Sequence, residues 1–394
     1  MPWKAATPVE SRLDFVHAVK RAEVSMAELC RRFGVSRQNG YKWLQRYEES
    51  GLAGLELRSR APNTSPRSMT SEVRELVLAA RKRFPHWGPR KLRAILSRRH
   101  PLILLPATST IGVLLEREGL VQPRKLRPKT PPYEHPFLAY VHPNDVWCID
   151  FKGQFRLQNG EYCYPLTVTD GVSRYLLGCR AFPGIHEAPA MKAMERLFRE
   201  YGLPFAIRSD NGTPFASTLA ICGLSRLAIW FVRLGIRPER IDPGKPQQNG
   251  RHERMHRTLK AETTHPPASN QRAQQAVFDR FRREFNELRP HEALGLKCPA
   301  EVYTPSIRPF PRKLAPLEYP SWNQVRLVDC NGCISLRYAS VFLGRTLVGE
   351  HVGLEPVADG VWLVRLGSLE IGRIDERLMR MEKVPVRWVE GRAA

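Results

Sequence analysis

The sequence lacks several features that would assign it to common classes of protein. No apolar run reaches the ~18 residues that a membrane-spanning helix needs, and the first residues, MPWKAATPVE, contain no apolar core of a signal peptide. The eight cysteines include one C-x-x-C pair, Cys330 and Cys333, without the further ligands of a zinc site. The Asn331-Gly332 between them favours a two-residue hairpin turn. We therefore expect a protein of the reducing cytoplasm without a membrane partner.

Acidic residues are also scarce. The 394 residues include 39 Asp and Glu against 62 Lys and Arg, for a net charge of +23. Residues 1–140 hold 26 basic and 12 acidic residues, which is +14 of that total. Lys and Arg replace the counterions that condense on nucleic acid, so the charge predicts a polyanionic partner. Ribosomal and membrane-surface proteins are also basic, and charge alone does not separate these classes.

Residues 1–57 have the pattern of a helix-turn-helix domain. A helical spacing of apolar residues in SRLDFVHAVKRAE is followed by two helices that Ser25 and Ser36 can cap, with Gly34 in the turn between them. An ordinary helical hairpin is the alternative, but the basic second helix favours DNA binding. Its exposed face is predicted to contact phosphates and base edges through Arg37, Gln38, Asn39, Lys42 and Arg46.

A second helical unit is predicted over residues 71–121, between linkers at 58–70 and 122–142 that are rich in Pro and basic residues. Pro89 marks the first turn of one helix, and Thr108 or Ser109 can cap another. The unit is either a second helix-turn-helix or a three-helix spacer. Its candidate DNA contacts, together with those of the following linker, are Arg90, Lys91, Thr108, Ser109, Arg124, Lys125, Arg127 and Lys129.

The remaining chain changes from helical to mixed and then to strand-rich. Residues 143–300 read as three strands, a helix, a strand and further helices, which is the plan of a mixed α/β domain with a central sheet. A Pro-rich linker at 301–320 separates it from residues 321–380, where short alternating segments predict a small β-barrel.

Three acids stand out in the α/β segment. Asp150 lies inside an apolar strand in VWCIDFKG, and Asp210 lies where the strand of AIRSDNG gives way to a turn. Glu253 lies in the first turns of a helix that Asn249 could cap. An acid inside a strand is costly unless it is paired or binds a cation, and three converging carboxylates suit Mg²⁺. Two such ions can activate a water or a 3′-hydroxyl at a phosphodiester.

Glu253 is surrounded by basic residues in KPQQNGRHERMHRTLK, which predicts side chains that hold a nucleic-acid strand beside a cation site. His252 and His256 could be zinc ligands, but the basic neighbours favour a DNA-facing or structural role. Asp145 and Asp170 read as turn residues. The candidate DNA contacts of this segment are Lys245, Arg251, Arg254, Arg257 and Lys260.

The segments DVWCIDFKG, IRSDNGTPF and PGKPQQNGRHERMHRTLKAE resemble the DDE signature of bacterial insertion-sequence transposases with a retroviral-integrase-like core. The resemblance extends over nearly the whole chain. It implies an RNase H-like core, with Asp150, Asp210 and Glu253 as catalytic metal ligands for two Mg²⁺ ions, which Mn²⁺ can replace. The implied chain is multidomain α/β, with N-terminal helix-turn-helix domains, the mixed-sheet core and a C-terminal small β-barrel.

The spacing of the acids departs from that pattern. Many relatives place about thirty-five residues between the second acid and the glutamate, whereas 42 separate Asp210 from Glu253 here. The extra residues are expected around ICGLSRLAIWFVRLGI. Glu239 is the nearby rival, but it lies in a predicted Pro-bounded loop without the QNG context. Glu262 lies more than two helical turns beyond Glu253.

The predicted function is a DNA transposase. The helix-turn-helix units would bind terminal inverted repeats, and the core would hydrolyse a phosphodiester and join the freed 3′-hydroxyl to target DNA. Joining two DNA ends implies a homodimer or higher assembly at the nucleoid. One alternative is a DNA-binding regulator with an inactive core, which would bind the repeats without metal-dependent nicking. Another is an RNase H-type ribonuclease, which would prefer RNA–DNA hybrid over duplex DNA.

Overall fold

The computed structural model describes residues 7–57, 69–121, 137, 140–217, 220–242, 244–382 and 387–388. It contains two compact units, Met1–Ser68 and Met69–Ala394, which we describe separately. Within the described residues, no helix combines the length and apolar character needed to cross a bilayer. The sequence divides the chain into seven domains and linkers, and the residues at which these segments begin and end stay predictions.

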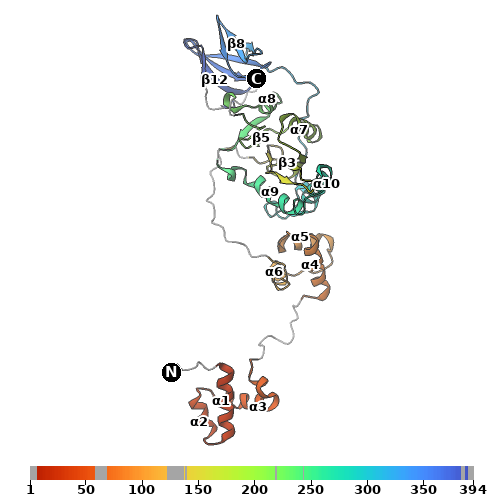
Figure 1. Cartoon of the computed structure of the whole chain (residues 1–394), viewed down its shortest axis with the longest axis vertical. Coiled ribbons are helices and arrows are strands. Elements are labelled where there is room, and N and C mark those ends of the chain that lie inside the picture. The colour runs from red at the N-terminus through yellow and green to blue at the C-terminus, as the bar shows by residue number, and fades with distance from the viewer. Residues whose placement is uncertain are drawn as a thin grey trace. The chain divides into compact units, whose positions relative to one another are not determined.

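The first unit contains three helices whose starts follow from their capping residues (Figure 1). They are α1 (Pro8–Arg21), α2 (Met26–Arg32) and α3 (Arg37–Ser50). Ser25 and Ser36 accept from backbone N–H groups of α2 and α3, as predicted. Helices α2 and α3 pack so closely that a Cβ at Gly40 would lie 2.8 Å from Cys30 Sγ. This arrangement confirms the predicted helix-turn-helix order.

The second unit begins with another helical bundle, formed by α4 (Ser71–Arg83), α5 (Pro89–Arg99) and α6 (Thr108–Arg117). Pro89 is the first residue of α5, as predicted, because its missing N–H has no partner to lose there. The predicted cap of α6 is wrong. Thr108 is already helical, and the N-cap position belongs to Ala107, whose methyl group cannot accept a hydrogen bond. The bundle core is formed by Val77, Leu92, Ile111 and Leu115, among others.

The core domain contains a mixed sheet, as predicted. Leaving aside the short β2 (Phe155–Arg156), its order is β4-β3-β1-β5-β6. Strands β4 and β1 run antiparallel to β3, whereas β5 and β6 continue parallel to β1. Three antiparallel and two parallel strands in this order give the RNase H-like plan. The bounds are β1 (Val146–Phe151), β3 (Tyr162–Asp170), β4 (Leu176–Phe182), β5 (Ala206–Ser209) and β6 (Arg237–Arg240).

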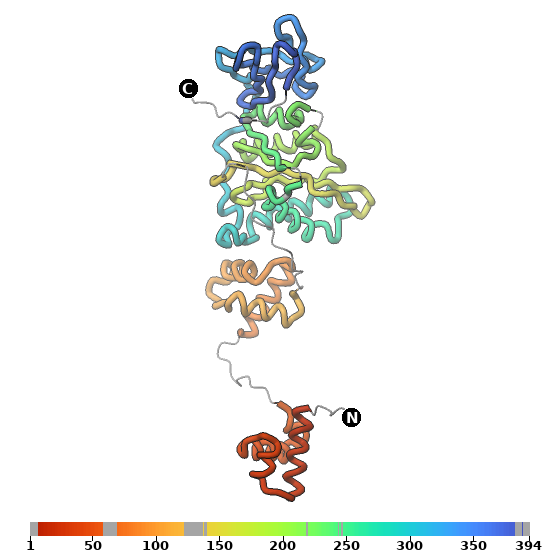
Figure 2. The backbone as a smooth tube through the Cα atoms, turned by 90° about the vertical axis from the view of Figure 1, so that its left-hand side faces the viewer, coloured from red at the N-terminus to blue at the C-terminus, as the bar shows by residue number. Residues whose placement is uncertain are grey.

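Helices cover both faces of this sheet (Figure 2). On one face, α7 (Glu187–Tyr201) and α8 (Arg226–Arg233) pack on Trp147, Ile149 and Ile207. On the other, α9 (Gly250–Thr263) and α10 (Gln271–Arg283) pack on Leu176 and Cys179. Because side chains alternate along a strand, Asp150 points to the same face as Cys148, opposite to Trp147 and Ile149. The α9 face therefore receives this acid.

Helix α8 joins the core to the C-terminal β domain, and it lies between them in Figures 1 and 2. Its Leu227 and Phe231 belong to the core of the mixed sheet. Its Ala228, Ile229 and Val232 belong to the core of the β domain. Helix α8 lies within the segment where the extra residues between Asp210 and Glu253 were expected. The long interval between the two acids therefore contains a helix that also packs against the β domain.

The β domain is an antiparallel sheet with a separate hairpin. The sheet order is β13-β12-β11-β10-β7, with β14 beside β12, and β8 pairs with β9. Among the described residues, no pairing closes this sheet, so the predicted barrel is not confirmed. The bounds are β7 (Gln324–Leu327), β8 (Cys333–Leu336), β9 (Ala339–Phe342), β10 (His351–Ala358), β11 (Val361–Leu366), β12 (Leu369–Asp375), β13 (Arg380–Glu382) and β14 (Arg387–Trp388).

The second helical bundle contacts the end of the core. Arg98 donates to the Leu296 carbonyl and to Glu301 Oε2, each at 3.0 Å. Leu288, in the π-helical turn η4 (Glu284–Leu288), packs against the bundle core. Contacts with both polar and apolar groups hold α5 beside this part of the core.

We predict that Ile229→Ala lowers the free energy of unfolding by about 2–5 kcal/mol, the usual range for truncating a buried large aliphatic side chain. Ile229 is 3% exposed and packs between α8 and the β domain. Chemical denaturation measures the change. Ile307→Ala is the control, because Ile307 is 94% exposed and its truncation should change stability by less than about 0.5 kcal/mol. Equal losses in both variants would contradict this role of α8.

Candidate active site and nucleic-acid interface

The pairing of β1 with β5 brings two of the predicted acids together. The strands run parallel, and Cys148 is the partner of Arg208. Asp150 lies two residues further along β1, and Asp210 is the first residue after β5, two residues beyond Arg208. Both leave the sheet at the same edge, where the carboxyl ends of parallel strands meet. The sequence prediction that these acids share one edge agrees with this register.

The turn after Asp210 holds its carboxylate in place. The Gly212 backbone N–H donates to Asp210 Oδ1 at 3.0 Å. A Cβ at position 212 would lie 3.0 Å from Asp210 Oδ2, so only glycine lets the carboxylate lie this close to the turn. Asn211 Nδ2 donates to the Ile241 carbonyl at 2.6 Å, which ties the turn to the chain after β6.

Glu253 comes from the first turn of α9, where a negative charge is favourable beside the helix N-terminus. The predicted cap is wrong in detail. Asn249 is the N-cap residue, but its side chain makes no capping hydrogen bond, because the preceding η3 turn (Pro246–Asn249) leads directly into the helix. The loop before it is fixed by Gln248, whose Nε2 donates to Asp242 Oδ2 at 3.0 Å.

The three acids influence one another electrostatically. Burial raises the pKa of Asp150 to about 7, and the charges of Asp210 and Glu253 act in the same direction, while Lys152 opposes them. Among the described residues, the cluster of possible metal ligands whose donor atoms all lie within 4.8 Å is Asp150, His252 and His256. Asp210 and Glu253 lie outside that compact cluster. The side chain of Glu253 is 43% exposed and can rotate toward it.

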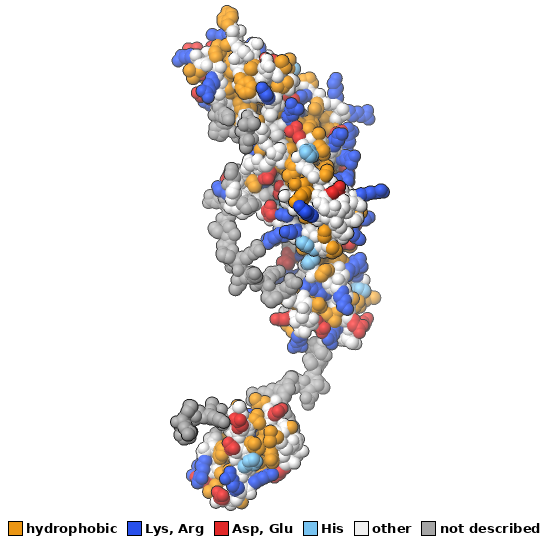
Figure 3. All heavy atoms as spheres, in the orientation of Figure 1, with side chains coloured by type: hydrophobic (Ala, Val, Ile, Leu, Met, Phe, Trp, Pro, Cys, Tyr) orange, Lys and Arg blue, Asp and Glu red, His pale blue; other side chains and the backbone are white. Residues whose placement is uncertain are grey.

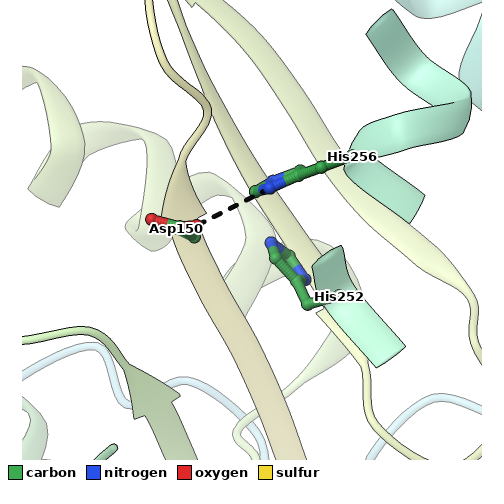
Figure 4. A group of neighbouring side chains, drawn as sticks. All are labelled: Asp150, His252 and His256. Atoms are coloured by element: carbon green, nitrogen blue, oxygen red, sulfur yellow. Dashed lines mark ion pairs between the residues drawn. The ribbon is translucent and has the colours of Figure 1, made fainter. Parts of the chain in front are cut away.

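His252 and His256 lie beside Asp150, with the ring of His256 facing its carboxylate (Figure 4). Both are buried, which excludes the DNA-facing role that the sequence allowed. His252 Nε2 lies 2.8 Å from Thr167 Oγ1, and its Nδ1 lies 2.7 Å from Thr169 Oγ1. His256 Nε2 lies 2.7 Å from Thr167 Oγ1. Burial lowers the pKa of His252 to about 3, so its ring is neutral at pH 7.

The five residues from His252 to His256 read H-E-R-M-H, the letters of the zinc-protease pattern H-E-x-x-H. In such a site both imidazoles turn a nitrogen toward the ion. Here both nitrogens of His252 are already occupied by threonine hydroxyls. The pattern therefore does not form a zinc-protease site in this fold.

The rival acids have structural partners. Glu239 does not lie in a loop, as the prolines suggested, but in β6, because Pro238 is tolerated in this short strand. Its carboxylate is buried and pairs with Arg208 at 3.0 Å. Glu262 pairs with Arg289 at 2.6 Å. Asp145 and Asp170 accept backbone N–H groups in turns, as predicted.

A cavity of about 1610 Å³ lies beside α9 on the same face of the sheet. Cys148 and Thr169 are among its lining residues. Its walls come from α5, α9 and the segment after α10, so it lies between the second bundle and the core. Its basic lining side chains are Lys91, Arg174, Arg208, Arg251, Arg254, Arg257 and Arg289.

These cations are only partly neutralised. Arg208 and Arg289 have carboxylate partners. Among the described residues, no acid forms an ion pair with Arg174, Arg251 or Arg254. Burial lowers the pKa of Lys91 to about 8, and the charge of Arg289 acts in the same direction. A group of mutually repelling cations in a cavity attracts an anion, and phosphate groups satisfy such a site.

The other predicted DNA contacts are distributed over both units. Arg37, Gln38, Asn39 and Lys42 are exposed on α3, and Arg46 is half-buried over the Trp43 ring. Arg90 lies 3.3 Å from Glu292, and Lys245 lies 3.0 Å from Asp242. Ser109 and Lys260 are exposed, and Thr108 is half-buried. The face shown in Figure 3 has more basic than acidic side chains. Outside the described residues lie Arg124, Lys125, Arg127 and Lys129.

Sequence reasoning missed several residues around the acids. Thr167 and Thr169 could have been identified from the sequence, because two threonines on one face of the apolar strand YPLTVTD need a polar partner. His256 was named from the sequence as DNA-facing or structural, but its position beside Asp150 was not predicted. Lys152, two residues after Asp150, has the weakest signal, since a lone lysine at a strand end is common.

The raised pKa of Asp150 predicts how the acids affect stability. An acid whose pKa rises from 3.8 to about 7 on folding destabilises the folded state once it must ionise, and this penalty grows between those pH values. In a metal-chelating buffer, Asp150→Asn should therefore raise the melting temperature, by a margin that grows from about pH 5 to pH 8. Calorimetry on the full chain measures it, with Asp279→Asn, an exposed acid on α10, as control. An increase in melting temperature that stays the same from pH 5 to pH 8 would contradict the raised pKa of Asp150.

Family comparisons match both helical units, the mixed-sheet core and the β domain. The description "Integrase core domain" matches residues 141–246 and again 234–299. "Helix-turn-helix domain" matches residues 11–62, and "Homeodomain-like domain" matches residues 39–115. "IS481 family transposase, C-terminal domain" matches residues 323–382. The order of these matches is the order of the domains in the structure.

Individual relatives point the same way. An uncharacterized protein of insertion element IS476 from Xanthomonas euvesicatoria is 29% identical over 64% of this chain and 70% of its own length. One of insertion element IS407 from Burkholderia multivorans is 30% identical over 48% of this chain, and the match spans only 60% of that relative.

Among solved structures, the catalytic core domain of HTLV-2 integrase is 13% identical, with a TM-score of 0.31 over 42% of this chain and 99% of that one. With helix-turn-helix domains before an integrase core and a transposase-type C-terminal domain after it, the chain is similar to the bacterial insertion-sequence transposases that carry an integrase core.

Proposed function

We propose that this chain is a DNA transposase that binds the terminal inverted repeats of an insertion sequence, hydrolyses a phosphodiester with Mg²⁺ and joins the 3′-hydroxyl to target DNA. The observation that carries the proposal is that the pairing of β1 with β5 leads to Asp150 and Asp210 at one end of the two strands, with the charges of Asp210 and Glu253 close enough to raise the pKa of Asp150. These residues would be the catalytic metal ligands. The reaction needs no covalent protein intermediate.

The residues present fit a divalent cation. Three carboxylates supply hard oxygen ligands, and the unpartnered buried Nδ1 of His256 faces two of them. Two Mg²⁺ ions are expected, with Mn²⁺ as a substitute. When bound, the ions supply Lewis acidity at the scissile phosphate. The protein's own part is to orient the acids through the Gly212 N–H and the helix N-terminus, and to hold the strand beside them.

The basic cavity supports a path for the DNA backbone. Arg251 and Arg254 flank Glu253 on α9, so phosphates bound in the cavity would lead directly to the acids. Exposed polar side chains on α3, such as Gln38 and Asn39, would read base edges in the inverted repeat. Two DNA ends must be held for joining, so a homodimer or a higher assembly on DNA is part of the proposal.

We expect Asp150→Asn, Asp210→Asn and Glu253→Gln each to abolish cleavage and strand transfer, because each removes a charged ligand, while leaving repeat binding intact. The assay uses duplex carrying the inverted repeats that flank the gene, with Mg²⁺, and a gel-shift on the same duplex. Asp279→Asn should behave as wild type. Wild-type strand transfer by any of the three variants would remove that residue from the site, and binding without cleavage by the wild type would favour a regulator with an inactive core.

Arg254→Ala should weaken binding about equally to repeat and unrelated duplex, and should reduce the slope of log K against log salt by about one. Arg254 is exposed on α9 and lines the basic cavity. Arg196→Ala is the matched control, because Arg196 is exposed on α7 at the opposite face of the sheet. Binding that changes equally in both variants, or a salt slope that stays the same, would rule out the cavity as the DNA path.

A further inference from the structure

His256 has a buried ring nitrogen without a protein partner. The side chain is 0% exposed, and its Nε2 is anchored 2.7 Å from Thr167 Oγ1. Its other nitrogen, Nδ1, has no hydrogen-bond partner among the described residues. That atom lies 3.6 Å from Asp150 Oδ2 and 3.9 Å from Glu253 Oε1, and Figure 4 shows the ring facing Asp150. Both distances are too long for a hydrogen bond.

The Thr167 hydroxyl has a single proton, and the group that accepts this proton decides whether His256 Nδ1 is protonated. Thr167 Oγ1 contacts the Asp150 carbonyl at 3.2 Å and the Nε2 atoms of both histidines. If the hydroxyl donates to the carbonyl or to His252, then His256 Nε2 must be the donor, and its Nδ1 carries a bare lone pair. Two of the three possible arrangements therefore place a lone pair opposite two carboxylates. A cation between them would satisfy all three groups.

We propose that His256 Nδ1 is a ligand of a divalent transition-metal ion, such as Mn²⁺, at the site formed with Asp150 and Glu253. The inference rests on the proposed metal-dependent function and adds a nitrogen ligand to it. Adjacent ligands of an octahedral ion with bonds of about 2.1 Å are about 3 Å apart, and opposite ones about 4.2 Å apart. The observed separations of 3.6 and 3.9 Å lie between these two values, so binding an ion needs a small rotation of the two carboxylates.

His252 does not share this role. Each of its nitrogens lies within 2.8 Å of a threonine hydroxyl, so no lone pair is left for an ion. Its ring packs against that of His256 with centroids 4.4 Å apart, and it fixes the orientation of Thr167. His252 is a positioning residue behind the ligand, as is common for groups that orient metal-binding imidazoles.

A nitrogen ligand changes which ion the site prefers. Mg²⁺ favours oxygen ligands in a strict octahedron, whereas imidazole suits transition metals. We therefore expect a higher ratio of Mn²⁺ to Mg²⁺ affinity than three carboxylates alone would give. Replacing His256 with glutamine should lower the Mn²⁺ affinity roughly 10- to 100-fold, the range seen for changes around metal ligands, and Mg²⁺ affinity less.

The test is pulsed electron paramagnetic resonance of Mn²⁺ bound to the full chain, which detects ¹⁴N coupling from a directly bound imidazole. Wild type should show this coupling, and His256→Gln should lose it. His291→Gln is the matched control, because His291 Nε2 is also buried without a partner but lines the basic cavity. It should keep the coupling.

The outcomes separate this inference from the proposed function. Bound Mn²⁺ without nitrogen coupling in the wild type would overturn the ligand role of His256 and leave the three acids in place; this measurement does not depend on any variant folding. Mn²⁺ binding that is unaffected by both Asp150→Asn and Asp210→Asn would overturn the metal site itself. Nitrogen coupling that survives in His256→Gln would assign the signal to another residue and also overturn the inference.

Discussion

The parallel pairing of β1 with β5 is the constraint on which the site depends. The alignment of Cys148 with Arg208 brings Asp150, near the end of β1, and Asp210, directly after β5, to the same edge of the sheet. A shift of one residue would turn one acid to the opposite face, toward the apolar contacts of α7 and α8. The buried pair of Arg208 and Glu239 lies in the same register and stabilises it across β5 and β6. The site is thus a product of the sheet rather than of a flexible loop.

Charge is divided between two neighbouring regions of one face. The acids gather where β1, β5 and α9 meet, and burial raises the pKa of Asp150, with the charges of Asp210 and Glu253 acting in the same direction. The basic cavity adjoins them, with Lys91 and Arg174 held in partly buried positions that lower their pKa values. The first region is mainly acidic, with Lys152 as a nearby cation, and the lining of the second is mainly basic, with Asp170 and Glu292 as its acids. A metal ion and a nucleic-acid backbone are the partners that would neutralise both.

Much of the architecture could be predicted from local sequence. Ser25 and Ser36 cap their helices because capping depends on the next three residues alone, and Pro89 starts α5 for the same reason. The mixed sheet followed from alternation and turn signals. The same signals do not predict whether the β domain closes into a barrel, because closure depends on strand tilt and stagger rather than on alternation.

Features that depend on distant pairs were not predictable. Thr167 meets His252 and His256 only because β3 lies beside β1 under α9, and 85 or more residues separate them in sequence. The contact of Arg98 with Glu301 spans 203 residues. The long interval between Asp210 and Glu253 looked like a departure from the acid motif. It contains α8, a helix with two apolar faces that packs on two domains.

The central claim is that Asp150, Asp210 and Glu253 form one cation site despite that interval. The most direct measurement is anomalous scattering from crystals of the full chain soaked in Mn²⁺. The account predicts anomalous density within bonding distance of all three carboxylates. Density that leaves out Glu253, or no density at the ends of β1 and β5, would contradict it.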